Sequence, residues 1–416
     1  MTDNILSSLI NKTVLHNGLT VISENIPGYR SVSVGLWIKS GSRYESLDEM
    51  GLAHFIEHML FKGTSNRDAL QIASELEKYG GSINAFTGKE ETCFYAHILD
   101  THLKKAVDVL ADMICNSLFK AKDIAMEKQV VLEEIGSVQD SPEEHVFDIF
   151  QEKVFPHNPL GYPILGYSEN VTEINRDKIL QFFNKFYKPD NIIISAAGKV
   201  NHNELVELVT HSFNLSGKAH NNGLIEATAE RNLEFILNKN LNQSHICIGG
   251  QAVSYFDEKR FDLIALNTYL GAGLSSILFQ VLREELGYVY SVYSFLDFYK
   301  DTGIIGFYLG TDPKNKNHAI ERLYQELKKV VDKKLNEQSI SILKEQMKGS
   351  FFLSLESTFK RMSRLAKNEI YHKKFISYDD LIDSINHISA ESVHNAAELY
   401  LTQESLNIVS ITPGWN

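Results

Sequence analysis

The run Gly-Leu-Ala-His-Phe-Ile-Glu-His-Met-Leu-Phe-Lys-Gly-Thr at residues 51–64 contains His54, Glu57 and His58 in an H-x-x-E-H arrangement. Side chains three and four residues apart on an α-helix leave the same face, so both imidazoles and the carboxylate would lie within about one turn. Two imidazoles suit Zn²⁺, and an adjacent carboxylate can take a proton from a water that the metal activates. The pattern therefore requires a helix here and a further ligand from a distant segment.

A catalytic zinc site usually has three protein ligands and one open position, so the two histidines are not sufficient. Residues 127–135 have the apolar spacing of a half-buried helix. Glu127 and Glu134 lie seven residues apart on nearly one line of that helix, whereas Glu133 points away. We expect one zinc ion per chain, with Glu134 as its third ligand and Glu127 orienting a ligand histidine.

With these residues the chain resembles the pitrilysin/insulinase family of inverted-motif zinc peptidases, especially its mitochondrial processing peptidase-like branch. The resemblance extends over nearly the whole chain. In that family the third ligand is a glutamate about seventy-six residues after the second histidine, and a supporting glutamate precedes it by seven; Glu134 and Glu127 match these positions.

The resemblance implies a zinc-dependent endopeptidase with Glu57 as general base. It would hydrolyse peptides or N-terminal presequence-like segments inside a chamber. The alternative is a noncatalytic assembly or peptide-binding subunit of a processing complex, a kind of relative that typically lacks one or more metal-site residues. Half-size members of the family usually pair, so we expect a homodimer, with a heterodimer containing a related subunit as the alternative.

Further site residues follow from the same resemblance. Residues 80–87 are the candidate edge strand for holding an extended peptide through backbone pairing. Within it, Asn84, Ala85 and Thr87 match the substrate-binding strand of the family. Arg283 and Tyr290 match an arginine and a tyrosine seven residues later that reach the substrate, where they would hold a peptide carbonyl and stabilise the oxyanion. Tyr288 is the alternative to Tyr290.

The second half of the chain repeats the order of predicted elements in the first half, without the histidine pair. In the first half we expect strands around the turn at 17–18 and at 31–40, helices at 51–61 and 68–79, strands at 80–87 and 91–100, and helices at 102–116 and 121–139. In the second half we expect strands at 232–237 and 245–251, a helix at 261–271, a hairpin of 286–298 with 303–310, and helices at 318–333 and 340–355. Duplication with loss of ligands from one copy is the economical interpretation.

These patterns predict an α+β fold of two related domains, each a mainly antiparallel sheet with helices packed on one face. A chain of 416 residues exceeds the usual size of a single core. We expect a catalytic domain at 1–215, a polar linker at 216–230 and a ligand-free domain with substrate contacts at 231–416.

Composition restricts the partners and the compartment. A formal charge of -12 argues against nonspecific nucleic-acid binding and favours basic peptides among the substrates. No apolar run is long enough to be an integral membrane segment. The first residues lack the features of a signal or transit peptide, which favours a bacterial cytoplasmic protein, with a mature mitochondrial matrix form as the alternative. The three cysteines are expected to be reduced thiols.

Overall fold

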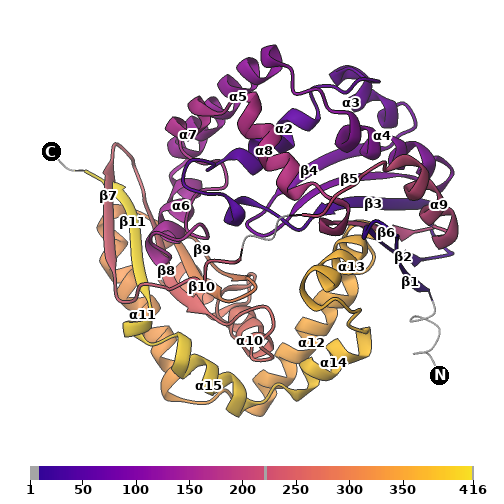
Figure 1. Cartoon of the computed structure of the whole chain (residues 1–416). Coiled ribbons are helices and arrows are strands. Elements are labelled where there is room, and N and C mark those ends of the chain that lie inside the picture. Colours follow the sequence, from indigo (N-terminus) through magenta and orange to yellow (C-terminus); the bar gives the residue numbers. More distant parts are fainter. Residues whose placement is uncertain (1–8, 220–222, 415–416) are drawn as a thin grey trace. The chain divides into compact units, whose positions relative to one another are not determined.

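The computed structural model describes residues 9–219 and 223–414, which form two compact units (Figure 1). The first unit comprises Met1–Gly136, Tyr162–Leu224 and Leu353–Ser377, and the second comprises Ser137–Gly161, Ile225–Phe352 and Tyr378–Asn416. Residues 1–8, on which the expected location of the protein depends, and residues 220–222 of the predicted linker lie outside the described residues.

The first unit contains a six-stranded sheet in the order β1-β2-β6-β3-β5-β4. Only the β2–β6 pair is parallel; the other neighbours are antiparallel. Its strands are β1 (Ile10–Val14), β2 (Thr20–Asn25), β3 (Ser31–Ile38), β4 (Ser82–Thr87), β5 (Thr92–Leu99) and β6 (Ile192–Gly198). Its helices are α2 (Leu52–Leu60), α3 (Ala69–Glu77), α4 (Leu103–Asn116), most of α5 (Ala121–Asp140), α7 (Ser168–Glu173), α8 (Arg176–Phe186), α9 (His202–Ser212) and α13 (Thr358–His372), with the short η1 (Ser42–Tyr44), η2 (Asp100–His102) and η3 (Pro189–Asn191).

Strand β3 shows how both faces of this sheet are covered. Its alternate residues Val34 and Leu36 are fully buried in the core that includes α2 and α4. On the opposite face, the Ser33 hydroxyl lies 2.8 Å from the hydroxyl of Thr358. A Cβ at Gly35 would lie 2.8 Å from the sulfur of Met362. Helix α13, from the C-terminal half of the chain, therefore covers the second face.

The second unit contains a five-stranded sheet in the order β7-β11-β8-β10-β9, in which only β7 and β11 are parallel. Its strands are β7 (Glu234–Lys239), β8 (Ser244–Ala252), β9 (Val289–Phe298), β10 (Gly303–Thr311) and β11 (Asn407–Pro413). Its helices are α6 (Pro142–Val154), α10 (Arg260–Gly271), α11 (Lys316–Asp332), most of α12 (Glu337–Ser354), α14 (Tyr378–His387) and α15 (Ala390–Tyr400), with η4 (Phe279–Glu285), η5 (Pro313–Asn315) and η6 (Gln403–Ser405).

Helix α6, from the N-terminal half of the chain, is the counterpart of α13 in this second unit. Its buried side chains Val146 and Phe150 join one apolar cluster with Cys247 and Val409 of strands β8 and β11. Figure 1 shows α6 beside β8 and β11, and α13 beside β3 and β6. Each sheet thus receives one helix from the other half of the chain.

The strand order confirms the predicted α+β fold and the internal duplication. The series β2-β6-β3-β5-β4 and β7-β11-β8-β10-β9 have the same connections and directions, and β1 is an addition at one edge. The units differ from the contiguous domains predicted at 1–215 and 231–416, because α6 and α13 lie with the other half of the chain. Each of these helices buries the second face of a sheet: α6 does so through the apolar cluster with β8 and β11, and α13 through Met362 and the Thr358 hydroxyl.

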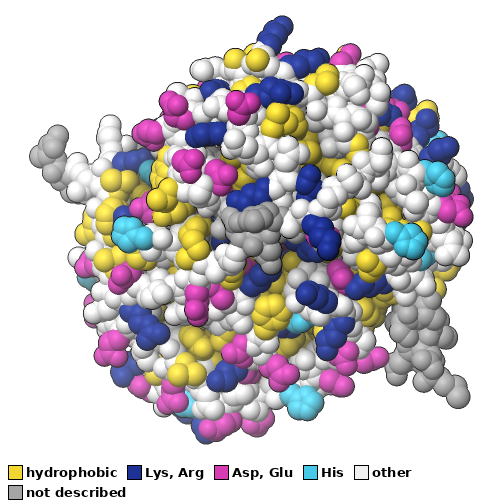
Figure 2. Space-filling model, viewed as in Figure 1, with side chains coloured by type: hydrophobic (Ala, Val, Ile, Leu, Met, Phe, Trp, Pro, Cys, Tyr) yellow, Lys and Arg dark blue, Asp and Glu magenta, His cyan; other side chains and the backbone are white. Residues whose placement is uncertain are grey.

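The surface carries both signs of charge, with acidic and basic side chains distributed over the visible face (Figure 2). Among the described residues, no helix combines the length and the apolar character needed to cross a bilayer.

Candidate metal centre

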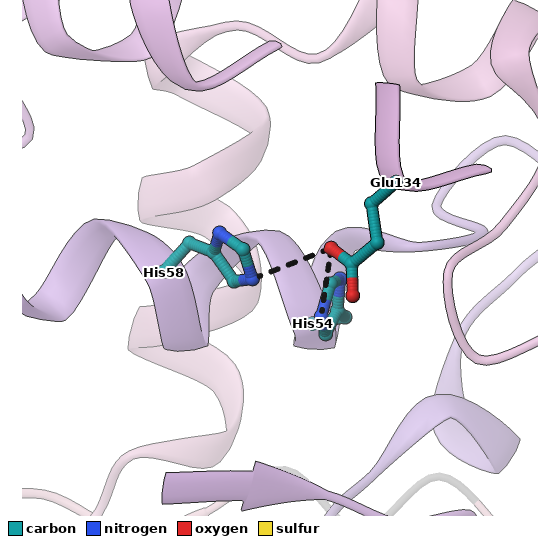
Figure 3. A group of neighbouring side chains, drawn as sticks. All are labelled: His54, His58 and Glu134. Carbon is teal, nitrogen blue, oxygen red and sulfur yellow. Dashed lines mark ion pairs between the residues drawn. The ribbon is translucent and has the colours of Figure 1, made fainter. Parts of the chain in front are cut away.

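His54, His58 and Glu134 converge on one point in the first unit (Figure 3). The histidines project from α2 and the glutamate from α5, and one ligand atom from each residue lies within 4.8 Å of the other two. The Glu134 Oε2 atom is 3.8 Å from Nε2 of His54 and 3.7 Å from Nε2 of His58. Tetrahedral zinc with bonds of about 2.0–2.1 Å would hold its ligand atoms about 3.4 Å apart, so these three residues fit zinc and leave a fourth position free.

The two histidines differ in their electrostatic surroundings. Burial, and next the neighbouring His58, lowers the pKa of His54 to about 3, which keeps its imidazole neutral and able to bind a metal. Burial alone would lower the pKa of His58 as well. The hydrogen bond to Glu127 and the negative charges of Glu134, Glu127 and Glu57 together outweigh burial and raise that pKa.

Glu127 fixes the orientation of His58. Its Oε1 atom accepts a hydrogen bond from Nδ1 of His58 at 2.9 Å, which leaves Nε2 directed at Glu134. Its Oε2 atom lies 2.6 Å from the Lys62 ammonium. Burial would raise the pKa of Glu127, but the hydrogen bonds from His58 and Lys62 and the positive charges of these groups together outweigh burial and lower the pKa. The structure thus brings Glu127 to the contact that the sequence predicted for it.

Glu57 lies beside the cluster and is held by the end of strand β4. The Thr87 hydroxyl donates a 2.5 Å hydrogen bond to Oε2 of Glu57. Burial raises the pKa of Glu57 and outweighs the opposing effect of that bond, and the charge of Glu134 raises it further. A carboxylate with a raised pKa is suited to taking and returning a proton near neutral pH. Thr87, predicted as a substrate contact, here contacts the carboxylate of Glu57.

Glu45, which no sequence pattern indicated, fixes the N-terminus of helix α2. The buried Glu45 carboxylate accepts hydrogen bonds from the backbone N–H groups of Gly51 at 2.9 Å and Ala53 at 2.7 Å. Burial raises the pKa of Glu45 to about 8, despite these two bonds. Because Glu45 precedes the helix by several residues, it does not have the spacing of a capping box. The sequence analysis also did not select Lys62, because only the fold places its ammonium beside the carboxylate of Glu127.

Strand β4 is the last strand of its sheet, at the edge expected for residues 80–87. Asn84 is exposed, and its side-chain oxygen accepts a 2.8 Å hydrogen bond from the backbone N–H of Ala85. That N–H group is therefore occupied by the strand's own side chain. Rotation of Asn84 would free it for pairing with an extended peptide.

Arg283 and Tyr290 belong to the second unit, whereas the three residues of the metal cluster belong to the first. The Arg283 guanidinium, on η4, lies 4.9 Å from the centre of the Phe279 ring. Tyr290 is 57% exposed near the start of the edge strand β9. The alternative Tyr288 packs against the second core, and its carbonyl accepts a bond from the Thr311 hydroxyl.

Together, a duplicated α+β fold and a His-His-Glu cluster with an adjacent glutamate define an inverted-motif zinc-peptidase class. The family model described as "Insulinase (Peptidase family M16)" matches residues 20–168. The model described as "Peptidase M16 inactive domain" matches residues 173–347. The chain belongs to this insulinase family, peptidase family M16.

Related proteins are similar over almost their full length. A Bacillus subtilis protein named uncharacterized zinc protease YmxG is 38% identical over 410 residues, covering 98% of this chain and 99% of that protein. A Streptomyces coelicolor protein, also named a zinc protease, is 36% identical over 410 residues, covering 96% of this chain and 89% of its own. These names imply zinc as the metal.

Two crystal structures share the fold. A protease from Helicobacter pylori has a TM-score of 0.91 at 22% identity, covering 97% of this chain and 99% of that chain. A Pseudomonas fluorescens protein described as a peptidase M16 inactive domain has a TM-score of 0.91 at 16% identity, with 98% of each chain covered. At these identities the likeness concerns the architecture of the chain.

Proposed function

We propose that the protein is a zinc-dependent endopeptidase in which Glu57 acts as general base beside the His54, His58 and Glu134 ligands. The observation that carries the proposal is the placement of a half-buried carboxylate, held by Thr87, next to a complete three-ligand set. A noncatalytic subunit would have no need of this arrangement.

Each residue has a distinct part in the proposed reaction. Bound zinc would activate a water molecule and polarise the scissile carbonyl. Glu57 takes a proton from the attacking water and passes it to the leaving amine. Thr87 holds the Glu57 carboxylate in place through its hydroxyl hydrogen bond. Glu127 holds His58 so that one ring nitrogen stays directed at the metal position.

The substrates that we propose are peptides or presequence-like segments bound in extended form. Strand β4 offers an unpaired edge within the described residues of its sheet. Asn84 would turn aside and let the peptide pair with the backbone of Ala85. Arg283 and Tyr290 are proposed to hold the substrate carbonyl, and the net charge of -12 favours basic peptides. The homodimer and the cytoplasmic location stay predictions from the sequence.

The experiment that tests the proposal is replacement of the general base. Glu57→Gln should retain zinc and lower kcat for peptide hydrolysis by about 10²–10⁴-fold, since the amide cannot take a proton. The matched control is Glu133→Gln, an exposed glutamate of α5 next to a ligand, which should leave kcat unchanged. Normal hydrolysis by Glu57→Gln protein with its zinc in place would contradict the assignment.

A further inference from the structure

The two units differ at the position of helix α9. In the first unit α9 packs against α4 and β2. Its side chains Leu205 and Val209 are buried in the core, and Phe213, directly after the helix, continues this four-residue spacing. By strand order and connection, α11 and β7 are the counterparts of α4 and β2. Among the described residues of the second unit, no helix packs against both α11 and β7.

A groove of about 680 Å³ lies at this position in the second unit. It is lined by helix α11, by the starts of β7 and β11, and by residues 401–404, which include the start of η6. The α11 side chains Ile320, Tyr324 and Val331 face it at helical spacing, together with Ile408 of β11. All four are only partly buried against the second core. This apolar strip corresponds to the surface that α9 covers in the first unit.

The rim of the groove is acidic. Glu234, Glu321 and Glu404 line it and are all exposed. The one lysine of the lining, Lys328, has its ammonium 3.1 Å from the carboxylate of Asp332, which offsets its charge. Basic side chains flanking an apolar strip would complement this rim.

We propose that this groove docks an amphipathic helix of a partner protein, with apolar residues at four-residue intervals and lysine or arginine along both flanks. The internal counterpart α9 defines the helical form and the apolar face, and the three glutamates define the charge. The lining contains none of the residues that we propose for the metal centre or for substrate contacts, so we commit to a partner protein as the occupant.

A peptide taken from the chain's own helix tests the proposal. Residues 199–215 are synthesised with a hydrocarbon crosslink to hold the helix, and the exposed Glu204 and Glu207 are replaced by lysine. Binding of the labelled peptide to full-length Glu57→Gln protein is measured by fluorescence anisotropy. The lysine peptide should bind at least about tenfold more tightly than the same peptide with its natural glutamates, and added salt should weaken that binding.

Groove variants then locate the binding. The pair Glu321→Lys and Glu404→Lys should reverse the preference, so that the glutamate peptide binds more tightly. Tyr324→Asp should weaken both peptides by placing a charge on the apolar strip. The control pair Glu345→Lys and Glu398→Lys changes the same net charge at exposed positions outside the groove and should have no effect.

Two results would overturn the proposal. The first is peptide binding that the groove variants leave unchanged, which would place the peptide elsewhere. The second is an increased KM for peptide hydrolysis when the same groove substitutions are made in active protein, which would assign the groove to the substrate. The endopeptidase assignment does not depend on either result, because it is tested by Glu57→Gln.

Discussion

The two units have the same strand topology but differ in their ligands. In the first unit the helices α2 and α5 carry the three metal-site residues, whereas the corresponding helices of the second unit, α10 and α12, do not. In α5, the residues Ile124, Glu127 and Val131 are buried; in α12, Ile340, Leu343 and Met347 are buried at the same spacing. The chain passes between units at Gly136–Ser137 in α5 and at Phe352–Leu353 in α12, which gives the same alignment. Leu343 therefore takes the place of Glu127, Ser350 takes that of Glu134, and α10 contains no histidine.

This difference shows that the architecture does not require a metal. The second unit forms its sheet and packed helices around an apolar residue at the place where the first unit buries a carboxylate. A buried carboxylate is costly unless it is paired, and Glu127 is paired with both His58 and Lys62. The candidate metal centre is therefore a polar addition to a topology that the second unit forms without ligands.

Removal of the metal should have the largest effect on activity and a small effect on the fold. Treatment with a strong chelator is expected to abolish peptide hydrolysis, because the water loses its activating ion. The circular dichroism spectrum should stay unchanged. The Tm should fall by only a few degrees, a shift that corresponds to about 1 kcal/mol for a unit of roughly 200 residues. Global unfolding of the metal-free protein would show that the two units are not equivalent scaffolds.

The second-largest effect is expected when Glu127 is replaced by leucine, the residue at the corresponding position of the second unit. Glu127→Leu is expected to lower zinc affinity by about 10–100-fold, since His58 loses the acceptor that orients it. Competition with a chromophoric chelator measures the affinity. Glu127→Gln is the matched control and should lose less, because its amide oxygen can still accept from His58. Equal affinities in the wild-type and Glu127→Leu proteins would remove Glu127 from the account.

Substitution of Asn84 in the edge strand β4 should have the smallest effect on peptide hydrolysis. Asn84→Ala is expected to raise KM for peptide substrates by about two- to tenfold, or to lower kcat, with zinc content unchanged, because the side-chain contact of Asn84 with the peptide is lost. Ser82→Ala, at an exposed position of the same strand, is the control. If both variants have wild-type kinetics, Asn84 has no part in substrate binding.

Local spacing in the sequence was sufficient to predict the elements that carry the metal site. The helix predicted at 51–61 is α2, the helix at 121–139 is α5, and the helix at 261–271 is α10. These predictions succeed because helical periodicity fixes which residues share a face, and because His54, His58 and Glu134 depend on only two such faces.

The exchange of α6 and α13 could not be predicted in the same way. An amphipathic pattern shows that a helix buries one face but does not identify the sheet that covers it. The contacts of Lys62 with Glu127 and of Thr87 with Glu57 were also missed, since each joins segments far apart in the sequence. The predicted roles of Arg283 and Tyr290 rest on the resemblance to the family.

The most direct measurement is the zinc content of the purified chain and of Glu134→Ser, the variant that carries the residue of the second unit. Elemental analysis should find about one zinc per chain in the wild-type protein, consistent with three ligands at a single centre. The Glu134→Ser protein should remain folded and lose most of its zinc after dialysis. Wild-type protein without zinc after supplementation, or Glu134→Ser protein that retains one zinc with unchanged affinity, would contradict the account.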